Sequence, residues 1–247
     1  MKKTAAAFIL LFVFYVSACA SDFAGYKKYF EGYSKDYILI ADKKEKMIYA
    51  VDSNLNTSAA CRISTGINPE NKIYAGDNAT PEGAYTITEI YEEAKPEILA
   101  EAEREVQNCG EDCGEAQKKL LKLKKAYEAG RKKLALMNAV FFRAKDGYKK
   151  WGTKEDLGKN AYGPVFMRLS YPEKEDYKRH EAAKKRGYLP LRNDGSYPGP
   201  GSGIAIHGTN DPASLGQDAS SGCIRLLNEE VTELRRYASP GVKVIIK

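Results

Sequence analysis

A cysteine and a histidine near the carboxyl end of the chain have the types and spacing of a nucleophile and its base. His207 follows the apolar run 204–206, and Cys223 lies 16 positions further on. A thiol attacks as its thiolate and therefore needs a base beside it, for which histidine is the usual choice. The pair indicates acyl transfer, although a buried core cysteine and a strand-end histidine would produce the same spacing.

Small residues precede the candidate nucleophile. A glycine at 222 permits a tight backbone turn, and such a turn could aim the N–H groups of Ser221, Gly222 and Cys223 at a developing oxyanion. A catalytic base also needs a group that holds its tautomer. The sequence fixes no aspartate or asparagine for this task, and a backbone carbonyl near Gly208 would serve equally well.

Apolar and alternating runs predict the strands that would position these residues. The runs cover residues 37–41, 47–51, 61–65, 85–88, 165–169, 204–206 and 242–246. Charged residues 42–46 separate the first two runs and predict a hairpin. The flanks 35–91 and 160–247 therefore predict one β-rich domain.

Residues 92–150 differ from these flanks because they are rich in Glu, Lys, Ala and Leu. Their apolar residues recur at spacings of three, four and seven, which predicts a long helix. The stripe consists of Leu120, Leu123, Tyr127, Leu134, Met137 and Phe141. Gly130 occupies one position of this seam and costs the helix roughly 1 kcal/mol relative to alanine. A shorter helix should begin after Pro96, since proline suits a first turn.

Charge is segregated within this insertion. Residues 92–115 contain nine acidic and two basic side chains, whereas residues 116–150 contain two acidic and twelve basic ones. Two antiparallel helices would therefore attract each other modestly. Cys109 and Cys113 fall at the turn, where an oxidising compartment would allow them to pair. The insertion is interpreted as a solvated helical hairpin, or as a lid or docking arm for an unknown protein partner.

The amino terminus has the pattern of an export signal. Two lysines precede the apolar run 5–16, which is too short to span a bilayer, and small residues follow. Residues 1–18 are predicted to be a signal peptide that resembles the lipoprotein type, so that lipidated Cys19 would anchor the chain to a membrane. In the alternative, cleavage leaves Ser21 as the first residue. Both predict export to the periplasm or cell envelope.

The composition excludes several classes of function. The 247 residues carry a formal net charge of +6 with a pI of about 8.8. This charge is too mild to indicate a nucleic-acid partner, and no nucleic-acid-reading motif is present. Two histidines in the whole chain argue against a multi-histidine metal site. We therefore expect no multi-histidine metal site.

The fuller pattern resembles the L,D-transpeptidase catalytic (YkuD-type) family. The signature runs through 207–210, 220–226 and Asn228, and further blocks follow the family's order at 64–66, 76–85, 162–164, 201–204 and 240–244. The resemblance covers 35–91 and 160–247. It implies a mainly β fold, a YkuD-like β-sandwich or mixed β domain over 35–247 with the helical hairpin 92–150 inserted in it.

The resemblance also implies a chemistry. Cys223 would be the nucleophile and His207 its base, acting without a cofactor on peptidoglycan tetrapeptide stems with release of D-alanine. The family often has histidine where this chain has Ser221. If water is the acceptor, the same acyl-enzyme gives an L,D-carboxypeptidase or an amidase. A third interpretation is a non-catalytic cell-wall-binding scaffold.

Substrate contacts are assigned to five further positions, each with a structural alternative. Arg225 offers a fork-shaped cation for a substrate carboxylate or a structural ion pair, and Tyr162 lines the groove or belongs to the core. Gly208 and Thr209 shape the loop after the base or simply form a turn. Ser220 orients the nucleophile loop or caps it.

Three residues outside this set have structural predictions. His180 lies in the charged run 173–180 and is predicted to be solvated. Cys61 falls in a predicted strand and is assigned to the core. Asn228 precedes two glutamates and is predicted to cap a short helix that ends near 235–236.

Overall fold

The computed structural model describes residues 23–110, 113–139 and 158–247. The predicted signal peptide, Cys19, Ser21 and Phe141 lie outside these ranges. Within the described ranges, every helix is too short or too polar to cross a membrane.

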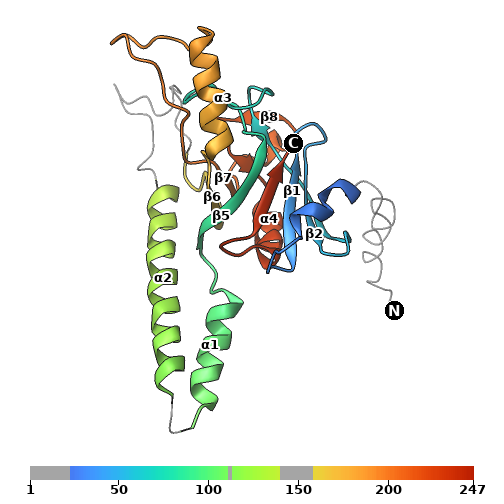
Figure 1. The fold of residues 1–247 in the computed structure, drawn as a ribbon. Helices are drawn as coiled ribbons and strands as arrows, with labels where there is room; N and C mark the ends of the chain where they lie inside the picture. Colours follow the sequence, from blue (N-terminus) through green and yellow to red (C-terminus); the bar gives the residue numbers. More distant parts are fainter. Residues whose placement is uncertain (1–22, 111–112, 140–157) are drawn as a thin grey trace, which may run out of the picture.

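Within the described residues, an eight-stranded mixed sheet forms the framework of the molecule (Figure 1). The strand order is β3-β2-β1-β10-β5-β6-β7-β9. The strands are β1 (Tyr37–Asp42), β2 (Met47–Asp52), β3 (Thr57–Arg62), β5 (Gly83–Glu92), β6 (Val165–Leu169), β7 (Ala205–His207), β9 (Ile224–Arg225) and β10 (Lys243–Ile246). The short strands β4 (Thr65–Gly66) and β8 (Asp218–Ser220) pair separately. The mainly β prediction is confirmed.

The predicted hairpin is present as the antiparallel pair of β1 and β2, and Asp42 accepts the backbone N–H groups of Lys44 and Glu45 in its turn. The run predicted at 61–65 differs from the structure, because β3 already begins at Thr57. Residues 57–60 are small, and their strand geometry comes from pairing with β2 rather than from an apolar pattern.

Both faces of the sheet are covered. Leu39 and Ala41 of β1 point into the main core, whereas Ile38 and Ile40 pack with Phe23 on the opposite face. A strand buried on both faces has a continuous apolar sequence. This explains why the run 37–41 does not alternate.

The insertion forms a helical arm that projects from the sheet (Figure 1). Helix α1 (Glu97–Asn108) begins directly after Pro96, as predicted, and α2 (Gly114–Asn138) runs back beside it. Lys119 pairs with Glu105 at 2.7 Å and Lys124 with Glu103 at 3.2 Å, so acidic α1 and basic α2 attract each other as expected.

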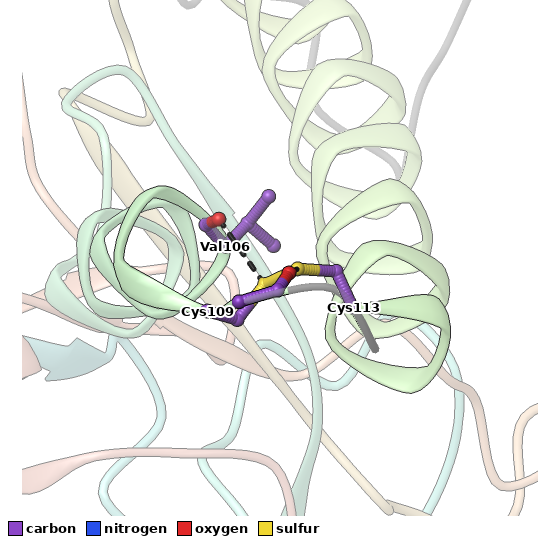
Figure 2. The surroundings of a disulfide bond; sticks show 4 residues. Val106, Cys109 and Cys113 are labelled. Atoms are coloured by element: carbon purple, nitrogen blue, oxygen red, sulfur yellow. Dashed lines mark hydrogen bonds between the residues drawn. A yellow bond between two sulfur atoms is a disulfide. The ribbon is translucent and has the colours of Figure 1, made fainter.

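A disulfide closes the tip of the arm. Cys109 follows the last turn of α1 and bonds to Cys113, which precedes α2 (Figure 2). The bridge lies beside Val106. The structure therefore contains the pairing that the sequence allowed but did not establish.

At its other end, α2 packs on β5 through a glycine. A Cβ built on Gly130 would lie 3.2 Å from Tyr91 Cδ1 and 3.3 Å from the Ile90 carbonyl oxygen. Leu134, one turn further on, is fully buried. The prediction treated Gly130 as a weak point of the seam. The structure shows that its missing side chain permits this close approach of the helix to the sheet. The helix-propensity penalty of glycine relative to alanine still applies.

The prediction that His180 is solvated is wrong. His180 is 5% exposed, and its Nδ1 lies 3.0 Å from the Ile73 carbonyl oxygen. It belongs to α3 (Lys174–Lys185), where Asp176, His180 and Ala183 lie on the buried face and the charged neighbours cover the outside. Cys61 is buried as predicted, and burial raises the pKa of its thiol to about 12.

Candidate active site

The candidate catalytic residues lie at one end of the sheet, on strands β6, β7 and β9. Phe166 pairs with His207, and His207 pairs with Arg225. Residues paired across neighbouring strands point to the same face of a sheet. His207 therefore shares its face with Phe166 and Arg225, while Ile206 and Ile224 point to the main core on the other side.

Cys223 lies on this same face. It immediately precedes β9, two residues before Arg225, and packs against a cluster that contains Tyr91, Phe166 and Ala205. The side chain is partly exposed, and its Sγ lies 3.6 Å from the Gly203 carbonyl oxygen. The structure thus brings Cys223 and His207 to one face of the sheet, on neighbouring strands and two residues apart in register.

The imidazole of His207 is buried and oriented. Its exposed fraction is 3%, and Phe166 stacks on the ring with 5.7 Å between centroids. Nδ1 lies 2.6 Å from the Gly208 carbonyl oxygen. Because a carbonyl oxygen only accepts, Nδ1 must carry the proton and Nε2 is left as the basic nitrogen. The orienting group is therefore a backbone carbonyl, the alternative that the sequence left open.

The surroundings of His207 favour its neutral form. Burial, joined by the positive charge of Arg225, lowers the pKa of the imidazole to about 3, against the opposing effect of the Gly208 carbonyl. At neutral pH the ring is uncharged and its Nε2 can accept a proton. This is the state that a general base requires before it acts.

The nucleophile loop is fixed by hydroxyl groups. Ser220 Oγ donates to the Cys223 carbonyl oxygen at 2.5 Å and accepts the Gly222 N–H at 3.1 Å. Ser220 is 1% exposed and binds the loop itself, which corresponds to its predicted loop-orienting alternative rather than to substrate contact. Because the Gly222 N–H is engaged in this way, Ser221 and Cys223 are the two amides that remain candidates for an oxyanion.

Thr80 also holds the nucleophile loop in place, and the sequence prediction did not identify it. Its Oγ1 donates to the Gly222 carbonyl oxygen at 3.0 Å and accepts the Gly66 N–H at 2.8 Å. Gly222 has φ +129°, and a Cβ there would lie 2.8 Å from the Ala79 carbonyl oxygen. The block around Thr80 was recognised in the sequence, but nothing in it showed that it meets the segment around residue 222.

The prediction that Asn228 caps a helix is wrong. Helix α4 (Asn228–Leu234) has Leu227 at its N-cap position without a side-chain cap. Asn228 Oδ1 instead accepts the Thr209 N–H at 3.0 Å. An asparagine at a helix start suits both tasks, and the fold selects the second by placing the 208–211 loop against it.

The remaining predicted residues surround the imidazole. Gly208 packs against Gly163, and Thr209 is 2% exposed, with its Oγ1 accepting the Asp211 N–H. These contacts place Thr209 inside the loop rather than at a surface. The Tyr162 ring lies 5.0 Å from the imidazole centroid.

Arg225 is half-buried beside His207, and its Nη1 donates to the Ala219 carbonyl oxygen at 3.4 Å. Among the described residues no carboxylate pairs with this guanidinium. The structural ion pair considered for Arg225 is therefore absent from the described part of the chain. The guanidinium remains a candidate for a substrate carboxylate.

A partly exposed thiol and a buried neutral imidazole on one face of neighbouring strands are the parts of a cysteine acyl-transfer site. The chain belongs to the L,D-transpeptidase catalytic domain family (YkuD), whose family model matches residues 36–246. Members of this family are cysteine-dependent L,D-transpeptidases. The matched range includes the helical arm.

Individual relatives are more distant. The Bacillus subtilis (strain 168) relative YkuD is 51% identical over 41 residues, which are 17% of this chain and 25% of that protein. The helical cell shape determining protein Pgp2 from Campylobacter jejuni is 17% identical with a TM-score of 0.43, over 90% of this chain and 55% of that one. Bd1075 from Bdellovibrio bacteriovorus is 17% identical with a TM-score of 0.42, over 88% and 49%. The chain thus spans about half of these solved structures and a quarter of the curated relative.

Proposed function

We propose that this protein is a peptidoglycan L,D-transpeptidase that forms an acyl-enzyme on Cys223. The observation that carries the proposal is the arrangement of His207: neutral, held by the Gly208 carbonyl through Nδ1–H, and on the same sheet face as Cys223. Membership of the YkuD family supports the substrate class, a tetrapeptide stem.

These positions support the following acylation step. The Cys223 thiol gives its proton to His207 Nε2 as sulfur bonds to the carbonyl carbon of the third stem residue. The amides of Ser221 and Cys223 would stabilise the oxyanion. When the intermediate collapses, the peptide bond to D-alanine breaks, and the imidazolium returns the proton to the leaving amine.

Deacylation reverses these roles. The amine of a second stem attacks the thioester carbonyl and loses a proton to His207, and the thiolate leaves and is reprotonated. The product contains a new amide bond, and the enzyme returns to its starting state. With water as the acceptor, the same acyl-enzyme would yield a free tripeptide.

The test is a product analysis with purified protein, tetrapeptide stems and an added amine acceptor. A cross-linked or exchanged peptide that forms in proportion to the acceptor supports transpeptidation. Tripeptide and D-alanine that form regardless of the acceptor would replace the proposal by a hydrolase. If wild-type protein and Cys223→Ala both give no product, the non-catalytic scaffold is favoured.

We further propose that the chain is exported and that residues 1–18 are removed, leaving lipidated Cys19 as a membrane anchor in the cell envelope. The lysine pair, the short apolar run and the small residues before Cys19 support this proposal. Mass spectrometry of the mature amino terminus tests it. An unmodified Ser21 terminus would eliminate the lipid anchor.

A further inference from the structure

We propose that Asn138, the last residue of α2, is a positioning residue that holds the Tyr162–Gly163 segment against His207. The helical arm would then be part of the catalytic scaffold rather than an independent appendage. The kinetic test of this inference rests on the proposed function, whereas its spectroscopic test does not.

Asn138 binds the segment 160–163 through its side chain and its backbone. It is 6% exposed, its Nδ2 donates to the Gly163 carbonyl oxygen at 2.7 Å, and its Oδ1 accepts the Tyr162 N–H at 3.0 Å. Its own carbonyl oxygen accepts the Asn160 N–H at 2.9 Å. A carboxamide that donates and accepts on neighbouring peptide groups fixes the position of both.

The segment held in this way contacts the imidazole and its hydrogen-bond acceptor. The Tyr162 ring lies 5.0 Å from the His207 ring, centroid to centroid. A Cβ on Gly163 would lie 2.7 Å from Gly208 Cα. The carbonyl oxygen of Gly208 accepts the hydrogen bond from His207 Nδ1–H. A shift of residues 162–163 would therefore disturb both the cover of the ring and the group that orients it.

The other end of this connection is anchored to the sheet. Gly130, Leu134 and Asn138 are spaced four residues apart and so follow one face of α2. Gly130 and Leu134 pack on this sheet, next to Tyr91 and Phe166. Sheet packing, rather than the distant arm tip, thus sets where Asn138 reaches the segment.

A loosened segment should change the protonation of His207. Burial is the largest cause of its lowered pKa, and the Tyr162 ring supplies part of that burial. The ionisable groups nearest the imidazole on this side of the sheet are Arg225, Cys223 and Tyr162 itself. Further along β5, β6 and α2 the same side carries Tyr91, Glu89, Arg168 and Lys133. When Tyr162 moves away, water reaches the imidazole and its pKa rises toward the ordinary value.

The experiment compares Asn138→Ala with Leu99→Ala, which weakens the arm without touching segment 160–163. Leu99 is buried in α1 and its loss should lower stability comparably. Nitrogen NMR of the imidazoles reads the protonation of His207, and His180 is an internal reference because the chain has two histidines. In Asn138→Ala we expect the pKa of His207 to rise and kcat to fall roughly tenfold with little change in KM. Leu99→Ala should change neither.

The inference is overturned if folded Asn138→Ala has the wild-type His207 titration and kcat, or if Leu99→Ala produces the same changes. If the alanine variant does not fold, Asn138→Ser is measured in the same way. Its short hydroxyl can keep only part of the hydrogen bonding to Tyr162 and Gly163, so the same changes are expected. Asn138→Asp, which loses the donor to the Gly163 carbonyl, should behave like the alanine variant. If wild type shows no turnover but the His207 titration still changes in Asn138→Ala, the proposed function fails and this inference stands.

Discussion

At the scale of single residues, the chemistry depends on where the proton of His207 sits. The short contact to the Gly208 carbonyl places it on Nδ1, and burial keeps the ring uncharged at neutral pH. His207 is therefore a neutral base whose Nε2 can take up a proton during the reaction.

This protonation state predicts how stability depends on pH. The unfolded chain binds a proton on His207 near pH 6.5, whereas the folded chain does so only near pH 3. Between these values the unfolded state holds more protons, so stability falls as the pH falls. We expect His207 to contribute up to about 1.4 kcal/mol per pH unit to this loss.

Urea unfolding of wild type and His207→Gln at pH 7, 5.5 and 4 measures that contribution, because the other titrating groups are common to both proteins. The wild type should lose stability more steeply on acidification. Equal pH slopes for the two proteins would show that His207 is not held neutral by the fold.

At the scale of elements, the sequence predicted the strands that have an apolar run and missed contacts between distant segments. The runs at 37–41, 47–51 and 165–169 match their strands closely, because burial requires those residue types. The buried side of His180 and the task of Asn228 depend on loops that only the fold brings near. Likewise, the motif around Cys223 identified the nucleophile, while its support by Thr80 could not be predicted from spacing.

Thr80→Val tests this support. Valine keeps the volume but leaves the Gly222 carbonyl and the Gly66 N–H without their partner, a loss of about 1–3 kcal/mol for each buried group. We expect kcat to fall as well as the free energy of unfolding, because Gly222 is adjacent to Cys223 and its displacement would move the sulfur. Thr88→Val is the matched control: Thr88 is exposed and its Oγ1 donates to the Arg168 carbonyl at 3.3 Å. Equal activity in the two variants would contradict the assigned role.

Gly130→Ala tests the docking of α2. Alanine normally stabilises a helix interior by about 1 kcal/mol relative to glycine, but here its Cβ would lie 3.3 Å from a backbone carbonyl oxygen of β5. We expect thermal unfolding to show no gain, or a loss. Gly114→Ala, with open space around its Cβ, should stabilise the same helix. If Gly130→Ala gains as much as Gly114→Ala, the close approach does not limit the packing.

At the scale of the whole molecule, a mixed sheet carries the reactive residues and a helical arm is inserted between two of its strands, β5 and β6 (Figure 1). The arm touches the site side of the sheet at one end and is closed by the Cys109–Cys113 bridge at the other. The two ends should therefore have different effects on activity.

The double variant Cys109→Ser/Cys113→Ser tests this separation. The bridge closes a very short loop, so its loss returns little entropy to the unfolded chain and should lower stability only slightly. Turnover of a soluble tetrapeptide should stay within about twofold of wild type, a difference of less than 0.5 kcal/mol in the barrier. A severe loss of turnover with the fold intact would show that the arm tip also acts on the site.

The central claim is that the sulfur of Cys223 takes the acyl group from a wall peptide. Rapid-quench mass spectrometry of the protein with a tetrapeptide stem tests this most directly. We predict a tripeptidyl adduct on the peptide that contains Cys223, formed together with free D-alanine, greatly slowed in His207→Ala and absent in Cys223→Ala. Free D-alanine released at the wild-type rate by Cys223→Ala, or an adduct located on another residue, would contradict the account.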